Sequence, residues 1–363
     1  MTQIPTRTLR EVGQSLWLDN ITRALLTSGT LKRYIDELGI TGLTSNPTIF
    51  DQAISRSTDY DQAIAGKVKA GVSGEQLFFE LALEDLTRAA DLFRPIHDAT
   101  DGVDGFVSLE VSPLLAYDTA STIAQAKELS ARAGRPNLFI KIPGTREGLP
   151  AIEEAIFAGV AVNVTLLFSR EHYVAAADAY MRGIERRIAA GLNPDVRSVA
   201  SVFISRWDRA VAGKVPAELH AQLGIAIAKR TYHAYRNLLE SDRAQRLANH
   251  GARPQRLLWA STGTKDPKDS DILYVAGLAS PHTVNTMPEA TLTAFASHGV
   301  IGPLLTPDGG DGEAVLARFG RAGVDVLALA ADLQADGAKA FVASWDELMA
   351  GLAAKTDALK KAR

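Results

Sequence analysis

The segment NLFIKIPGTREGLPAIEEAIFAGVAVNVTLL, residues 137–167, holds two short apolar runs on either side of a helical pattern. The runs at 137–143 and 161–167 are rich in Val, Ile, Leu and Phe, and residues 148–157 between them have helical spacing. Short apolar runs of this kind are typical of strands that are buried on both faces. The segment therefore predicts a β–α–β unit whose two strands are parallel.

The same alternation continues along most of the chain. Strand patterns lie at 15–20, 40–46, 105–112, 137–143, 161–167, 198–204, 255–262 and 282–287. Helical patterns lie between them at 22–38, 75–96, 119–133, 148–157, 171–190 and 206–247, the last long enough for two helices. Eight strands separated by helices predict an α/β fold, a closed (β/α)8 TIM barrel over about 15–290.

Two segments exceed a minimal barrel. The stretch 47–104, after the second strand, is long for one connection and predicts inserted helices near 58–70 and 75–96. After residue 288 no strand pattern returns, and the helical patterns that follow lie at 289–298, 312–322 and 326–360. We therefore expect a single domain over residues 1–363, with a C-terminal helical extension over about 289–363.

The last helical pattern carries an apolar stripe formed by Phe341, Trp345, Leu348 and Leu352. Apolar residues at helical spacing are most often core contacts, so we expect this helix to pack against the barrel. A lid over the functional site is the alternative interpretation.

Composition excludes several classes of protein. Hydrophobic residues make up 46% and charged residues 22% of the chain, which is typical of a globular protein rather than a disordered one. The absence of cysteine excludes disulfides, thiol nucleophiles and thiolate metal sites. Seven histidines without an HExxH or HxH pattern give little support to a metal site, so we expect neither metal nor cofactor.

The charge and hydropathy patterns also bear on partners. A net charge of -3 gives no sign of nucleic-acid binding. No apolar run approaches the ~20 residues of a membrane span, and the first residues lack a signal-peptide core. We therefore expect a cytoplasmic protein with no membrane partner, and either a monomer or a homodimer is compatible with the sequence.

Polar residues occupy positions where barrel strands should be apolar. They fall on one face of each strand, mostly in its second half, and apolar residues alternate with them. The set consists of Asp19, Asn46, Glu110, Lys141, Asn163, Thr165, Ser201, Ser261 and Asn285. Taken singly, each could be a hydrogen-bonded core group or an ion-pair partner. As a set on successive strands they predict an active site at the carboxyl end of the barrel.

Lys141 suggests the chemistry of this site. It lies between Ile140 and Ile142, and burial disfavours the charged ammonium, which leaves a nucleophilic amine that forms Schiff bases with carbonyl compounds. Asp19 and Glu110 can serve as separate acid–base groups. The other polar side chains can hold substrate hydroxyls, namely Asn46, Asn163 and Ser201, or a catalytic water, namely Thr165.

A phosphate group has two candidate contacts. Arg206 follows the sixth strand in VFISRWD, and the seventh strand runs into STGTKDP, which contains Ser261 and Lys265. A guanidinium near a helix start and the loop after the seventh strand both suit an anion. Alternatively, Arg206 pairs with Asp208, and STGTKDP is an ordinary turn.

The sequence resembles the transaldolases of the class I aldolase superfamily. The resemblance rests on SLWLDNITR, TGLTSNPTIF, SLEVSP, NLFIKIPGT, VNVTLLFS and SVFISRWD, in family order over about 15–290. It implies that Lys141 is the Schiff-base lysine, Asp19 the acid–base residue of C–C cleavage, and Glu110 with Thr165 the pair that holds the catalytic water. It also implies substrate contacts through Asn46, Asn163 and Ser201 and a phosphate contact through Arg206.

The reaction implied is transfer of a dihydroxyacetone unit in the non-oxidative pentose phosphate pathway. Sedoheptulose 7-phosphate and glyceraldehyde 3-phosphate give erythrose 4-phosphate and fructose 6-phosphate. Some members carry a second phosphate-binding arginine after the seventh strand. Here the loop offers Lys265 and Ser261 in its place.

Two other functions are weighed against transfer. A fructose-6-phosphate aldolase would release dihydroxyacetone to water, but such aldolases carry a tyrosine where this chain has Phe203. A non-catalytic sugar-phosphate-binding barrel would use Lys141 only as a cation.

Overall fold

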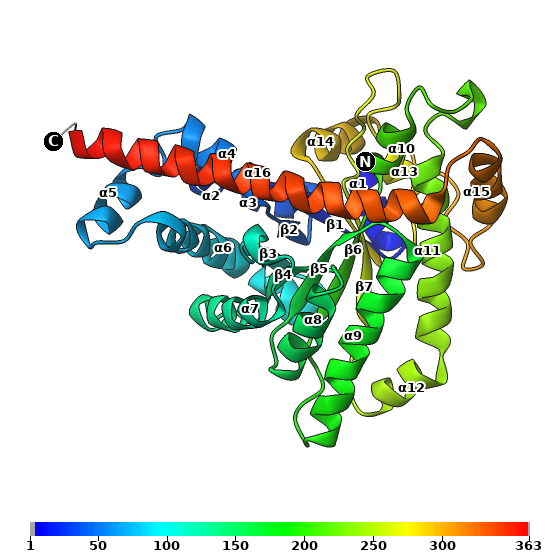
Figure 1. Cartoon of the computed structure of the whole chain (residues 1–363), viewed down its shortest axis with the longest axis horizontal. Coiled ribbons are helices and arrows are strands. Elements are labelled where there is room, and N and C mark those ends of the chain that lie inside the picture. Colours follow the sequence, from blue (N-terminus) through cyan, green and yellow to red (C-terminus); the bar gives the residue numbers. More distant parts are fainter. Residues whose placement is uncertain (1–3, 362–363) are drawn as a thin grey trace.

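The eight predicted strands close into a parallel barrel in which each strand pairs with its neighbours in the sequence and β8 pairs with β1. The structure is a computed structural model, and it describes residues 4–361. The strands are β1 Gln14–Asp19, β2 Gly42–Thr44, β3 Phe106–Glu110, β4 Leu138–Pro143, β5 Val162–Leu167, β6 Ser198–Phe203, β7 Arg256–Ala260 and β8 Thr283–Met287. The predicted TIM barrel is confirmed, and Figure 1 shows its strands beside the surrounding helices.

Most helices lie where the sequence predicts them, but two predicted helices are broken. The helices that match the predicted ranges include α6 Gly74–Ala99, α7 Thr119–Ala133, α8 Gly148–Phe157, α9 Arg170–Ala189, α14 Glu289–His298 and α15 Gly312–Arg321. The stretch 206–247 forms α10 Ser205–Val211, α11 Leu223–Glu240 and α12 Asp242–Asn249 rather than two helices. The stretch 22–38 is divided into α2 Arg23–Thr27, α3 Thr30–Arg33 and a π-helical turn, Tyr34–Leu38. Gly29 adopts a left-handed conformation between α2 and α3, with φ +76°, which interrupts the helix.

Three helices were not predicted at all. They are α1 Pro5–Glu11, α4 Pro47–Arg56 and α13 Leu273–Gly277. The signal for α4 is in the sequence, because Asn46 is its N-cap and Pro47 its first residue. The Ile49 amide donates to Asn46 Oδ1 at 3.1 Å. Asn46 therefore lies beyond β2, and the predicted strand 40–46 was too long.

The inserted helices are joined to the barrel through a buried acid. Asp85 on α6 accepts from Arg23 Nε at 2.9 Å and from the Tyr60 hydroxyl at 2.8 Å, and its side chain is fully buried. Burial raises the pKa of Asp85, and the Arg23 cation opposes this increase. Tyr60 directly precedes α5 Asp61–Lys69 and Arg23 is the first residue of α2, so one carboxylate on α6 connects the starts of α2 and α5.

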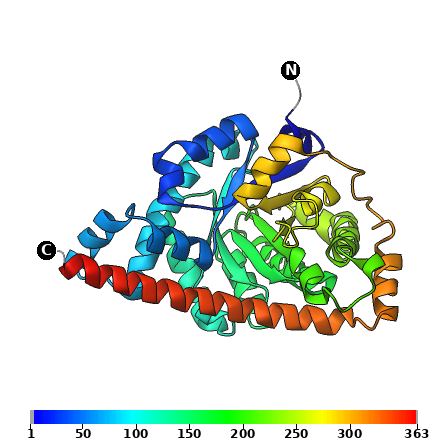
Figure 2. The same cartoon turned by 90° about the horizontal axis from the view of Figure 1, so that it is seen from above.

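The C-terminal helix α16, Val326–Lys361, runs as one long rod along the molecule (Figures 1 and 2). Its apolar stripe packs mainly on the inserted helices rather than on the barrel. The Trp345 ring lies 5.1 Å from Phe78 and 5.9 Å from Phe79, and Leu348 and Leu352 are buried. Neither α16 nor any other helix between residues 4 and 361 is apolar enough to cross a membrane.

Aromatic side chains fill the lower part of the barrel interior, toward the amino ends of the strands. The Phe106 and Phe139 rings stack with centroids 4.1 Å apart, and Trp17 lies 6.1 Å from Phe139. Gly42 on β2 makes room for them, since a Cβ there would lie 2.7 Å from the Trp17 indole. This aromatic layer closes the barrel interior below the carboxyl ends of the strands.

We expect Trp345→Ala to destabilise the fold by about 3–5 kcal/mol, because it empties the contact between α16 and the inserted helices. Urea unfolding monitored by circular dichroism measures the change. Leu327→Ala on the same helix is the control, since Leu327 is 60% exposed and the loss should stay within about 0.5 kcal/mol. Equal losses in the two variants would show that α16 is not held at Trp345.

Candidate active site

A cavity of about 500 Å³ opens at the carboxyl ends of the strands. Most predicted site residues line it, namely Asp19, Asn46, Lys141, Thr165, Ser201, Phe203, Arg206, Ser261 and Lys265. Glu110 and Asn163 do not line the cavity and are buried in the barrel interior. The structure therefore brings side chains from six strands and the loops after them to one place.

Lys141 and Glu110 form a buried ion pair. Strands β3 and β4 pair in the register Glu110↔Lys141, and Lys141 Nζ lies 3.4 Å from Glu110 Oε2. The Lys141 amine also donates to the Ser45 carbonyl at 3.0 Å. Lys141 and Glu110 are each only 5% exposed to solvent. From the sequence, burial alone disfavours the charged form of this lysine. The structure adds a carboxylate that can take its proton.

Burial raises the pKa of Glu110 above the ordinary range of a carboxyl group. The Lys141 cation lowers this pKa, the negative charge of Asp19 raises it, and Arg206 lowers it. Neither Glu110 carboxylate oxygen has a hydrogen-bond partner among residues 4–361, and the same is true of the buried Thr165 hydroxyl. Apart from the Lys141 ion pair at Glu110 Oε2, these oxygens lack a polar partner within residues 4–361 and are available to a polar molecule.

Asp19 is oriented by a chain of hydroxyl groups that the sequence did not reveal. Thr44 Oγ1 donates to Asp19 Oδ1 at 2.7 Å and lies 2.7 Å from Thr286 Oγ1. Because the Thr44 proton points to Asp19, Thr286 donates to Thr44. Both threonines line the cavity. These hydroxyl groups keep one Asp19 carboxylate oxygen hydrogen-bonded and leave the other available.

Asn285 was wrongly placed in the site. The register between β1 and β8 pairs Ser15 with Val284 and Trp17 with Thr286, so the inward residues of β8 are Val284 and Thr286. Asn285 points away from the cavity and accepts from Thr262 Oγ1 at 2.8 Å. Alternation along a strand could not decide between the two faces, because β8 is polar at neighbouring positions.

Asn163 and Ser201 belong to one buried chain of polar groups. Ser201 Oγ donates to Asn163 Oδ1 at 2.7 Å, and Asn163 Nδ2 donates to Ser108 Oγ at 3.1 Å. Asn163 pairs with Lys141 across β4 and β5. Asn163 therefore orients Ser201, which faces the cavity, whereas Asn46 uses its oxygen as a helix cap and keeps its amide group free to donate.

Arg206 is a largely buried cation without an acidic partner. Its guanidinium lies over the Phe203 ring, with Cζ 5.0 Å from the centroid, and it forms no ion pair or hydrogen bond within the described chain. Asp208 does not pair with it, because that carboxylate accepts from the Leu223 and Gly224 amides and from the Tyr274 hydroxyl. Burial lowers the pKa of Arg206, yet a guanidinium stays charged at neutral pH.

The loop after β7 is not an ordinary turn. Ser261 adopts a left-handed conformation, with φ +55°, and its hydroxyl lies 3.0 Å from Ser205 Oγ at the start of α10. A non-glycine residue in this conformation costs energy and is found at functional sites more often than elsewhere. Lys265 farther along the loop is exposed and reaches the cavity wall.

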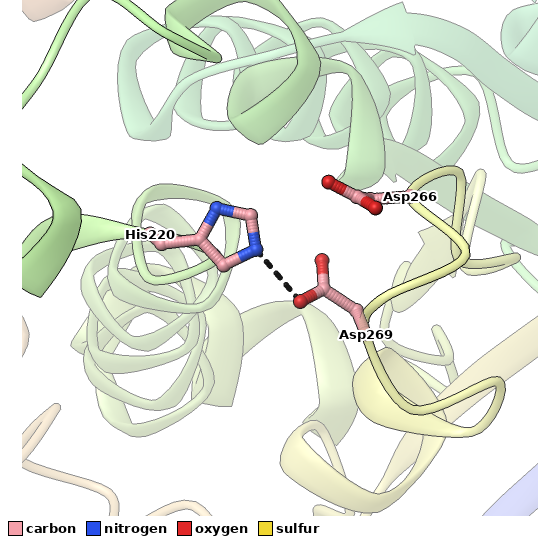
Figure 3. A group of neighbouring side chains, drawn as sticks. All are labelled: His220, Asp266 and Asp269. Carbon is pink, nitrogen blue, oxygen red and sulfur yellow. Dashed lines mark hydrogen bonds and ion pairs between the residues drawn. The ribbon is translucent and has the colours of Figure 1, made fainter.

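The same loop contributes to a group of side chains that could hold a metal ion. Atoms of His220, Asp266 and Asp269 lie within 4.8 Å of one another (Figure 3). His220 Nε2 and Asp269 Oδ1 already form a hydrogen bond of 2.7 Å, and the His220 side chain is half exposed. The three side chains of the group are not part of the cavity lining.

A second cavity, of about 430 Å³, lies at the opposite end of the barrel. Its wall includes the first residues of several strands, such as Gln14, Ser15 and Arg256. No predicted site residue reaches it, so the carboxyl end of the barrel is the candidate active site.

Several residues of the cavity were missed by sequence analysis. They are Thr44, Thr48, Ile49, Gln52, Ala260, Thr286, Pro288 and Phe341. Thr44 had a usable signal, because it is a polar residue within β2. Phe341 belongs to the apolar stripe for which a lid over the site was the alternative interpretation, and only the path of α16 across the molecule places its ring at the cavity.

Comparison with known proteins identifies relatives over almost the whole chain. The model of the transaldolase/fructose-6-phosphate aldolase family matches residues 16–352. A protein named transaldolase from Parafrankia sp. (strain EAN1pec) is 44% identical, with 95% of this chain and 96% of the relative aligned. One from Arthrobacter sp. (strain FB24) is 43% identical over 99% of both chains. One from Mycobacterium tuberculosis H37Rv is 44% identical over 94% of both chains.

We expect Lys141→Met to make the stability of the fold depend on pH. The substitution removes the cation beside Glu110, so burial raises the pKa of this carboxyl further. A raised folded-state pKa contributes stability below the ordinary carboxyl pKa of about 4.3, and that contribution is lost as pH rises through the folded-state value. The free energy of unfolding in urea should fall as pH rises above the ordinary range of a carboxyl group.

The matched control is the double variant Lys141→Met/Glu110→Gln, which has no carboxyl to ionise. Its free energy of unfolding should change much less over the same range of pH. If both variants lose stability equally, Glu110 is not the titrating group.

Proposed function

The chain belongs to the transaldolase/fructose-6-phosphate aldolase family, and we propose that Lys141 carries its reaction as a Schiff base. The activity is that of a transaldolase, since relatives of that name are 43–44% identical over nearly the full length. We infer that a dihydroxyacetone unit passes from sedoheptulose 7-phosphate to glyceraldehyde 3-phosphate, as in the non-oxidative pentose phosphate pathway. The observation that carries the proposal is the buried Lys141 amine, 3.4 Å from Glu110, at a cavity with a second carboxylate.

The first step needs a neutral amine. The Lys141 ammonium passes a proton to Glu110, whose raised pKa favours the protonated carboxyl. The amine then attacks C2 of the ketose, and the carbinolamine loses water to give an iminium ion. Glu110 and Thr165 are suited to hold that water, because their buried oxygens form no hydrogen bond within residues 4–361.

The second step breaks the C3–C4 bond. Asp19 takes the proton of the C4 hydroxyl, the bonding electrons pass to the iminium, and an enamine of dihydroxyacetone remains on Lys141. Erythrose 4-phosphate leaves as an aldehyde. When glyceraldehyde 3-phosphate replaces it, the enamine attacks the aldehyde carbon, Asp19 returns the proton, and water releases fructose 6-phosphate from the lysine.

Substrate binding follows from the other polar groups of the cavity. Arg206 offers an unpaired guanidinium to the phosphate, and Ser261 and Lys265 lie on the loop beside it. Asn46 and Ser201 can donate to sugar hydroxyls, with Ser201 held by Asn163. These sugar-phosphate contacts are proposals drawn from position and chemistry.

Phe203 favours transfer over simple cleavage. Its ring packs at 5.3 Å from Phe168 and beneath Arg206, so this face of the cavity presents carbon where a tyrosine would present a hydroxyl. Without an acid there, protonation of the enamine is disfavoured and the intermediate survives until an aldehyde arrives. A fructose-6-phosphate aldolase reaction is therefore the second candidate.

Borohydride tests the Schiff base. Added during incubation with fructose 6-phosphate, it should reduce the iminium to a stable secondary amine that mass spectrometry locates at Lys141. Lys141→Ala should give no adduct. Asp19→Asn should still give the adduct but lose about 10²–10⁴-fold in turnover, since imine formation does not use Asp19. A folded, active wild-type protein without an adduct would exclude the mechanism.

Acceptor dependence separates transfer from cleavage. With sedoheptulose 7-phosphate alone, we expect erythrose 4-phosphate to stop at about one equivalent per active site, because the enamine keeps the dihydroxyacetone unit. Glyceraldehyde 3-phosphate should restore continuous release, measured by coupled enzymatic assay. Phe203→Tyr should increase release without acceptor. Continuous release by the wild type without acceptor would favour the aldolase.

A further inference from the structure

The C-terminal helix α16 reaches the active site with one face near its start. Gln334, Gly337 and Phe341 are separated by three and four residues, so they share that face. Gln334 Nε2 donates to the Leu166 carbonyl at 2.9 Å and to the Gly144 carbonyl at 3.1 Å. Phe341 lines the cavity. The helix is thus attached to the ends of β4 and β5 and continues beside the mouth of the barrel.

The attachment coincides with an irregularity in β5. Leu166 has a left-handed backbone, with φ +59°, and the pairing of β5 with β6 shifts register between Val164 and Leu167. A carbonyl at such a bulge lacks its normal strand partner, and the Gln334 amide supplies one. The position of α16 therefore depends on a feature of the barrel itself.

Arg206 lies between the barrel and this helix. Its guanidinium carbon is 5.0 Å from the Phe203 centroid and 5.9 Å from the Phe341 centroid. Gly337 completes the enclosure, because a Cβ at that position would lie 3.2 Å from Arg206 Nη1 and 3.0 Å from Leu166 Cδ2. A larger residue at 337 would force the guanidinium or the helix to move.

Aromatic contacts hold a cation without neutralising it. A carboxylate partner would occupy the guanidinium donors and compete with an incoming anion, whereas a ring face attracts the charge and leaves the N–H groups free. Within the described chain Arg206 contacts two rings and forms no ion pair with an acid, although Glu110 acts on its charge from a greater distance. Such an arrangement suits a group that must bind the phosphate of a substrate.

We propose that Phe341, on the C-terminal helix, is a positioning residue that sets the preference for phosphorylated acceptors through Arg206. The proposal rests on the function proposed above, in which Arg206 binds phosphate. It gives α16 a role in specificity besides its packing on the inserted helices. Gly337 contributes by allowing the helix to approach the guanidinium closely.

A competition assay tests the proposal. Sedoheptulose 7-phosphate is the donor, and glyceraldehyde 3-phosphate competes with glyceraldehyde for the same enamine. The product ratio of fructose 6-phosphate to fructose then reports relative kcat/KM for the two acceptors and is independent of the donor half-reaction. Phe341→Leu should lower this ratio about 2- to 30-fold, because the ring contact is lost. Phe341→Tyr should keep the ratio near that of the wild type.

Two further variants test whether Phe341 changes the product ratio through Arg206. In an Arg206→Ala background, Phe341→Leu should change the product ratio no further, since the group it positions is gone. Leu327→Ala, an exposed position on the same helix, should leave the ratio unchanged. An unaltered ratio in folded Phe341→Leu, or an equal loss with and without Arg206, would overturn the proposal.

Inorganic phosphate separates failure of this proposal from failure of the proposed function. Calorimetry should show weaker phosphate binding by Phe341→Leu than by the wild type, whether or not transfer occurs. Weakened phosphate binding together with absent transfer would refute the proposed reaction and keep the positioning role. Equal phosphate affinity in both proteins would refute the positioning role alone.

Discussion

Closure of eight parallel strands into a barrel is the constraint on which the rest of this structure depends. Closure turns every second side chain inward, so the barrel interior is packed in its lower part, toward the amino ends of the strands, and the candidate site lies in its upper part, at their carboxyl ends. Stacked Phe106 and Phe139, with Trp17 beside them, fill the lower part. The upper part then holds polar groups that the aromatic layer and the helix ring shield from water, and Lys141 and Glu110 meet there on neighbouring strands.

The charged side chains at the cavity have different partners. Lys141 lies beside Glu110, and burial raises the pKa of that carboxyl so that it competes for the lysine proton. Asp19 is not part of this pair, and its carboxylate accepts a hydrogen bond from the Thr44 hydroxyl. Arg206 has aromatic partners in place of an acid, which keeps its donors available. In the proposed mechanism, proton transfer and anion binding therefore use different groups.

The two additions to the barrel depend on each other. The inserted helices α4, α5 and α6 present an apolar surface, and α16 covers it through Trp345 and the buried residues that follow. Without the insertion, the C-terminal helix would lack most of its packing partner. The same packing keeps the earlier part of α16 beside the barrel mouth, where Gln334 and Phe341 reach the strands and the cavity. Segments far apart in the sequence thus shape one wall of the site.

The sequence by itself determined the barrel, its strand count and the charged side chains that line the candidate site. Alternation along buried strands is a local property. A lysine or carboxylate within an apolar strand can be recognised from the sequence even when the exact end of the strand is not known. Tertiary structure alone decided which face of β8 turns inward, because register with β1 selects Thr286 over Asn285. It also decided the placement of Phe341 beside Arg206. Those outcomes depend on contacts between distant segments, and no local periodicity records them.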